Sequence, residues 1–389
     1  MNDNLESRRS SCLCLVLITL IAIPPLASCS RPRELKIGVV MSFTGASSFI
    51  SDDLRAGLEY QRALLSERKD IPPIRLEYRD DKASPELAKT LVADLAREGC
   101  LLIVGPVTSG IGIPMAEAAA AARIPVLSPT VSVGALAGKA DWFFRLYPSA
   151  EELGAFLGRR AAESGIRSVA VAGDGTNAVF AEEWRKGFGE ALRTAAAGAR
   201  ATEEDFAYFR SYAAGALFAP VPIADELLSA SKEAILLVSS STHAAALLSE
   251  LAAAPVHPAL FSSTWAFTSY VELVSYAGKA AEGVRSVLLF DPDSDSPSWK
   301  ALDAAMRSGR GVPTSPAQAL GAECLLAIAA AWKAGGHDRP SFRSRLAGVN
   351  FDGLQSTVSL DAFGDVLRPV YESVVRNGRV RAVPGPGTE

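Results

Sequence analysis

Short apolar runs alternate with longer amphipathic segments along most of the chain. The run LKIGVVM at 35–41 predicts a buried strand, and the pattern at 52–68 predicts a helix after it. A second strand is predicted at 73–81, where Ser84 before a proline then marks the start of the next helix. The strand CLLIVGP, an Ala-rich helix at 109–122 and a short strand at 124–130 follow. This alternation predicts a parallel sheet with helices on both faces.

A second series of the same kind begins near Tyr147. It predicts helices at 150–164 and 179–195 around the strand RSVAVAGD, whereas the pattern at 200–222 predicts no strand. The chain is therefore predicted to be an α/β protein with two lobes. The later predicted elements are strands at 233–241, at 258–264 and in EGVRSVLLF, helices at 297–309 and 315–334, and short strands toward a loose tail at 381–389.

The first 28 residues are typical of a signal peptide rather than of a folded segment. Arg8 and Arg9 precede an apolar core of about a dozen residues, which is too short to span a bilayer comfortably. The sequence Leu-Ala-Ser-Cys that ends at Cys29 resembles the bacterial lipobox. We expect removal of residues 1–28, lipidation of Cys29 and anchoring to a membrane in the periplasm or at the cell surface. The alternative is an ordinary signal peptide with a chance cysteine.

Length, charge and cysteine content limit the number of domains and the kinds of partner. The chain has 389 residues, 49% of them hydrophobic, which is enough for two domains with full cores. Its formal net charge of −4 and the absence of a long basic run make nucleic acid an unexpected partner. After the signal, Cys100 and Cys324 remain besides the lipid site. Both lie in apolar runs, which favours buried free thiols over a disulfide between them.

Motifs for catalysis, metals and cofactors are weak or absent. The turn GDGTNA at 173–178 matches a dinucleotide fingerprint, but this pattern is common after a strand. The segment DPDSDSPSW starts like a calcium loop, but Ser296 and Leu302 replace the required glycine and glutamate. The three histidines are far apart and are interpreted as surface or loop residues, and no G-x-S-x-G motif occurs. We therefore expect no enzyme activity, no metal and no cofactor.

The loop VGPVTSGIGIP at 104–114 has the glycine spacing of a phosphate loop without its lysine. Ser109 stands at the start of the predicted helix, where free backbone N–H groups and the helix dipole favour an anion. A carboxylate needs only such N–H groups and a hydroxyl. Thr130 and Ser132 follow the next strand, at the same edge of the sheet. The loop is predicted to bind a small carboxylate, although Ser109 and Ser132 could instead be simple helix caps.

Several motifs in a fixed order resemble one family. They are KIGVVMSFTGASS, EYRDDKASPELAKTLVADL, LIVGPVTSG, IPVLSPTVS, WFFRLYPSAEE, VAVAGD and LLFDPDSDSP, and they cover residues 35–375. Together they resemble the leucine-binding type of substrate-binding proteins from branched-chain amino-acid ABC transporters.

The resemblance implies a type I periplasmic binding fold. This fold has two doubly wound parallel-sheet lobes, joined by a hinge that the chain crosses three times. Lobe one is expected at 31–145 plus 290–361, and lobe two at 146–289 plus 362–380.

The resemblance also implies the positions of the ligand site. Ser109, Thr130 and Ser132 of lobe one are expected to hold a carboxylate or amide head. Lobe two departs from the family pattern, because Phe180 stands where a tyrosine is usual and the acidic partner of a ligand ammonium falls near Thr264 or Trp265. Asp174 is then the nearest candidate carboxylate. The residues expected from lobe two are Asp174, Phe180, Thr264 and Trp265.

The sequence thus predicts a lipid-anchored solute-binding protein. It is expected to capture a small polar solute, such as an amino acid, an amide or a related carboxylate, by hinge closure and to deliver it to an ABC permease. A ligand sensor with the same fold and no transport role is the alternative, and a hydrolase is a third possibility.

Overall fold

The computed structural model describes residues 34–45, 47–195, 208–212, 218–230 and 233–383. The predicted signal peptide, the predicted lipid site at Cys29 and most of the predicted tail lie outside the described residues. The described residues belong to one compact unit. In the part of the chain that is described, no helix is both long enough and apolar enough to cross a membrane.

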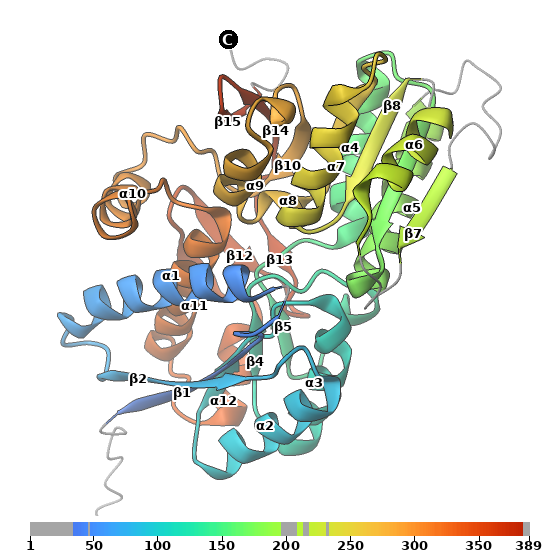
Figure 1. Cartoon of the computed structure of the whole chain (residues 1–389). Coiled ribbons are helices and arrows are strands. Elements are labelled where there is room, and N and C mark those ends of the chain that lie inside the picture. The colour runs from blue at the N-terminus through green and yellow to red at the C-terminus, as the bar shows by residue number, and fades with distance from the viewer. Residues whose placement is uncertain (1–33, 46, 196–207, 213–217, 231–232, 384–389) are drawn as a thin grey trace, which may run out of the picture. The chain divides into compact units, whose positions relative to one another are not determined.

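The first sheet has five parallel strands in the order β2-β1-β3-β4-β5 (Figure 1). This is a doubly wound order, in which the direction of winding reverses between β1 and β3. Alternate residues of β1 pack on opposite faces of the sheet, because successive side chains of a strand point to opposite sides. The strands are β1 (Leu35–Met41), β2 (Ile74–Asp80), β3 (Leu102–Val104), β4 (Val126–Ser128) and β5 (Phe143–Arg145).

Helices cover both faces of this sheet, as the strand–helix alternation predicts. The core on one face includes residues of α1 and α11, and the core on the other face includes residues of α2 and α3. Ser84 caps α2 by accepting a hydrogen bond from the Leu87 N–H, with Pro85 at the first helical position. The helices are α1 (Ser48–Ser66), α2 (Pro85–Arg97), α3 (Ser109–Ala122) and α11 (Pro316–Lys333).

The second sheet repeats the same winding. Its parallel strands follow the order β7-β6-β8-β9-β10, and β14 and β15 extend it as antiparallel strands. The strand β7 lies within 200–222, where the sequence pattern predicts none, and it pairs only with β6 at the sheet edge. The strands are β6 (Val169–Asp174), β7 (Tyr208–Tyr212), β8 (Ala234–Val238), β9 (Ala259–Ser262), β10 (Arg285–Leu288), β14 (Tyr371–Arg376) and β15 (Arg379–Ala382).

The helices α4 and α5 cover one face of the second sheet, and α6, α7 and α9 cover the other. α4 and α5 approach closely because glycines lie between them. A Cβ on Gly187 would lie only 2.0 Å from the carbonyl oxygen of Glu151. The helices are α4 (Ala150–Glu163), α5 (Ala178–Ala195), α6 (Pro220–Ala230), α7 (Ser241–Ala253), α8 (Thr264–Phe267) and α9 (Tyr270–Ala277). The predicted α/β class with two doubly wound parallel sheets is confirmed.

A small third sheet bears on the predicted lobe boundary. Its strands β11 (Asn350–Asp352), β12 (Thr357–Leu360) and β13 (Val366–Leu367) follow the helices α10 (Pro297–Arg310) and α12 (Arg339–Leu346). β13 pairs with β12, whereas β14 pairs with β10 of the second sheet. The last predicted change of lobe, at residue 361, falls between β12 and β13 of this sheet.

A buried ion pair ties the chain segments that run between the sheets. The Arg368 Nη1 lies 2.7 Å from the Glu323 Oε2, and these side chains are 3% and 1% exposed. Arg368 also donates to the Leu289 carbonyl, and its guanidinium lies 4.3 Å from the centre of the Phe290 ring. The other carboxylate oxygen of Glu323 accepts from the Leu354 N–H. The pair therefore connects α11, the segment after β10 and the segment before β14.

The two remaining cysteines are buried apart from each other. Cys100 and Cys324 are both free thiols. Burial raises the pKa of each thiol above its usual value. Both are therefore protonated and unreactive near neutral pH.

Candidate ligand-binding site

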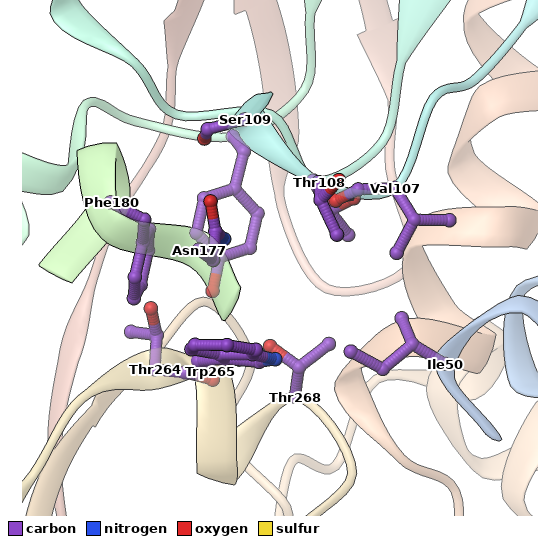
Figure 2. Close-up of a pocket in the computed structure, with 11 residues that line it drawn as sticks. Ile50, Val107, Thr108, Ser109, Asn177, Phe180, Thr264, Trp265 and Thr268 are labelled. Atoms are coloured by element: carbon purple, nitrogen blue, oxygen red, sulfur yellow. Dashed lines mark hydrogen bonds between the residues drawn. The ribbon is translucent and has the colours of Figure 1, made fainter. Parts of the chain in front are cut away.

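A small cavity lies where strand ends of the two sheets face each other (Figure 2). The space open to a water molecule inside it is about 30 Å³. Each lining residue follows the carboxyl end of a parallel strand, which is where open α/β sheets bind ligands. The residues from the side of the first sheet are Ile50, Val107, Thr108, Ser109, Thr130 and Tyr147. Those from the side of the second sheet are Asn177, Phe180, Thr264, Trp265 and Thr268.

The loop after β3 places the amino end of α3 at the cavity. Gly105 has a φ of +125°, and a Cβ there would lie 1.9 Å from the Val40 carbonyl oxygen, so only glycine fits. Gly110, in contrast, would meet nothing within 4 Å. Only the first of the two glycines is required by the backbone, so their spacing does not indicate a phosphate loop. Thr108 is the N-cap residue of α3, and its side chain makes no capping hydrogen bond.

Of the three hydroxyl residues predicted from the first sheet, two line the cavity and one does not. Ser109 and Thr130 both line the cavity. The Ser109 Oγ accepts a 3.3 Å hydrogen bond from the Ser132 N–H, and its own O–H donates to no group among the described residues. The Thr130 hydroxyl donates to the Val107 carbonyl at 2.6 Å. Ser132 is fully buried behind Ser109 and does not line the cavity, and its hydroxyl has no partner among the described residues.

Three predicted residues from the side of the second sheet do line the cavity. The rings of Phe180 and Trp265 meet edge to face, with their centres 5.9 Å apart. Thr264 is 2% exposed, and its hydroxyl has no hydrogen-bond partner within the described part of the chain. In Figure 2 these three side chains surround one end of the cavity, opposite Ser109. The site thus combines hydroxyls with a largely aromatic wall.

Asp174, the fourth residue predicted from this side, does not line the cavity. One carboxylate oxygen accepts from the backbone N–H and the hydroxyl of Thr176, at 3.0 and 2.7 Å. The other lies 2.7 Å from the Nδ1 of His243. Burial by itself would raise the pKa of Asp174, but hydrogen bonds from His243 and Thr176 outweigh it and hold the pKa below its usual value.

The interpretation of His243 as a surface or loop residue is wrong. It lies in the first turn of α7, it is half-buried, and its ring stacks on Phe218 at 4.0 Å. Its partner Asp174 is 69 residues away in sequence, so no local pattern could have paired them.

Sequence reasoning missed several lining residues, of which Asn177 and Tyr147 are the most informative. Asn177 follows β6 in the GDGTNA turn and is 7% exposed, and its Oδ1 has no partner among the described residues. Tyr147 follows β5, and burial raises the pKa of its hydroxyl. Both follow the carboxyl end of a parallel strand, so a search of every strand end would have found them. Within the described residues, no cluster of side chains could hold a metal ion.

The sequence of residues 34–378 matches the family model described as periplasmic binding protein. The chain belongs to this family. Its members are substrate-binding receptors for transporters and not enzymes, and membership implies an extracytoplasmic location.

A curated relative agrees with this assignment over part of its length. A Leu/Ile/Val-binding protein from Rhizobium johnstonii is 25% identical over 122 residues, which is 31% of this chain and 32% of that protein. The match therefore spans about a third of this curated relative.

Two solved structures share the fold. One is a solute-binding protein of an ABC transporter from R. palustris, in complex with benzoate (TM-score 0.80, 19% identity, 90% of this chain and 95% of the other). The other is the branched-chain amino acid transporter substrate-binding protein LivJ from Streptococcus pneumoniae, in complex with isoleucine (TM-score 0.77, 18% identity, 90% and 98%). The resemblance to leucine-binding-type proteins and the type I periplasmic binding fold are confirmed.

Proposed function

We propose that this periplasmic binding protein captures a small solute with a carboxylate or amide head and delivers it to an ABC permease. The observation that carries the proposal is the cavity itself, which is lined by strand ends of both sheets. A solute there contacts both lobes at once, so its binding energy favours their closed arrangement. Two structures with the same fold contain benzoate and isoleucine. Both compounds are small and carry a carboxylate, which supports a ligand of this class.

The head of the solute is proposed to lie at the amino end of α3. The first N–H groups of a helix have no partner within the helix, and the side chain of Thr108 leaves them uncapped. Ser109 adds a hydroxyl donor beside them. The positive end of the helix dipole strengthens the preference for an anionic head.

The small size of the cavity supports the proposed closure around a solute. The space in the cavity that is open to a water molecule is small, about 30 Å³, and we propose that the walls separate to admit a solute. The two sides share a buried apolar cluster, and hydrogen bonds also join them. The Glu183 carboxylate of α5 accepts from the Gly134 N–H at 2.9 Å, and the Ala317 N–H donates to the Thr268 carbonyl at 3.1 Å.

Hinge closure predicts a smaller radius of gyration on ligand binding. The solute is first found by a thermal-shift screen of amino acids, amides and carboxylic acids, since a ligand at 100 times its Kd adds about 2.7 kcal/mol of stability. Small-angle scattering of the mature chain is then compared with and without that solute, with a compound that fails the screen as the control. An unchanged scattering curve at saturation would count against closure.

We propose that a lipid on Cys29 anchors the protein to a membrane. The lipobox-like Leu-Ala-Ser-Cys predicts that Cys29 carries lipid after removal of residues 1–28. Cells that express the full chain with labelled palmitate should label the wild type and not the variant Cys29→Ser. Equal labelling of the two proteins would refute the anchor without affecting the proposed solute binding.

A further inference from the structure

We infer that the site selects a carboxylate with an uncharged, apolar body and rejects the α-amino acid of the same shape. This inference rests on the proposed function, because it specifies the ligand class of the same cavity. Of the described residues that line the cavity, none carries a charged side chain. An ammonium group that loses its water shell needs a carboxylate or several acceptors, and an unpaired one is strongly disfavoured.

Two carboxylates on elements that contribute to the cavity, Asp174 and Asp53, already have other partners. Asp174 is held by Thr176 and His243, as described above. Asp53 lies in α1, three residues after Ile50. It accepts from the Ser315 hydroxyl at 2.7 Å and the Gln318 amide at 3.1 Å, and it pairs with Arg310. Neither carboxylate lines the cavity. A ligand ammonium would have to break one of these sets of bonds to gain either carboxylate as a partner.

The free polar groups in the cavity suit a carboxylate. Asn177 is more than nine-tenths buried, and its side-chain oxygen has no partner among the described residues. Amide oxygen and nitrogen are interchangeable by a half-turn, so this side chain can present its N–H₂ to an anion. In the view of Figure 2, Asn177 lies between Ser109 and Trp265, and all three residues line the cavity. Asn177 is thus a second group, independent of the helix end, that has an unused hydrogen-bonding capacity in the cavity.

The remaining walls fit an apolar body. Phe180 and Trp265 present ring surfaces, and Ile50 and Val107 close the far side. A branched or aromatic hydrocarbon group can contact these side chains without leaving a polar group unpaired. The amino acid and the plain acid differ only in the ammonium, which meets no carboxylate among the described residues that line the cavity.

The test compares matched pairs on the wild-type mature chain by calorimetry. The pairs are 4-methylpentanoate with leucine, and 3-phenylpropanoate with phenylalanine, so each pair differs only in the α-ammonium. In at least one pair the plain acid should bind 100-fold or more tightly than the amino acid. Amino acids that bind as tightly as their plain acids would overturn the inference and leave the proposed function standing. Binding of neither member of either pair, with no hit in the wider solute screen, would overturn both.

The isosteric variant Asn177→Asp provides a reciprocal test. It places a carboxylate in the cavity with almost no change in shape, and circular dichroism confirms folding. The plain acid that binds the wild type should lose at least tenfold in affinity, and its amino-acid partner should lose less or gain. Equal losses for the two compounds would contradict the assignment of the cavity to a carboxylate that lacks an ammonium.

Discussion

Replacing Arg368 with methionine is expected to lower the free energy of unfolding by about 3–5 kcal/mol. The change removes the partner of Glu323, whose carboxylate is 1% exposed. Among the described residues, the carboxylate then keeps only the hydrogen bond from the Leu354 N–H. The cost comes mainly from the buried charge that is left unpaired, rather than from the attraction that is lost. The guanidinium contacts with the Leu289 carbonyl and the Phe290 ring are lost as well.

Urea unfolding of the variant and two controls measures this effect. Arg97→Met breaks an exposed pair with Asp94, in which Arg97 is 77% exposed, and should change stability by less than about 1 kcal/mol. The double variant Arg368→Met with Glu323→Gln removes both charges and should recover at least half of the loss. A small effect of Arg368→Met, similar to that of Arg97→Met, would show that the buried pair does not hold the crossing segments together.

Much of the fold is visible in the sequence because its elements follow local rules. The strand at 35–41 and the helix at 109–122 agree with the predicted ranges, since apolar runs and helix-forming stretches mark them directly. The edge strand β7 was missed because its segment, Tyr208–Tyr212, shows no apolar run or clear alternation. Pairing with β6 is a tertiary effect that overrides the weak local pattern.

The candidate site was predicted in part for a similar reason. Ser109 and Thr130 follow strands, and the winding of a parallel sheet brings such residues to one edge. Asp174 lies at a strand end too, but its carboxylate turns to His243, a contact that depends on the packing of α7. Asn177 lies three residues later in the same turn and faces the cavity instead. The sequence therefore locates the edge where a ligand can bind, while side-chain directions need the structure.

Ser109→Ala is expected to weaken a carboxylate ligand by roughly tenfold or more, which corresponds to at least 1.4 kcal/mol. The Ser109 hydroxyl is proposed to donate to the ligand oxygen beside the free N–H groups of α3. A hydrogen bond to a charged group contributes about 1.5–3 kcal/mol, about twice the value for a neutral acceptor. The uncharged amide of the same ligand should therefore lose less. If Ser109 only shapes the loop through the Ser132 N–H, acid and amide should weaken alike.

Ser128→Ala is the matched control for this prediction. Ser128 is a buried serine of the neighbouring strand, it donates to the Pro106 carbonyl and accepts from the Val131 N–H, and it does not line the cavity. Its loss should affect acid and amide equally, through the shape of the loops.

The most direct test of solute binding at the start of α3 is calorimetry of one acid and its amide on the wild type, Ser109→Ala and Ser128→Ala. The proposed site predicts a larger loss for the acid than for the amide in Ser109→Ala alone. Equal losses for acid and amide in Ser109→Ala would contradict it.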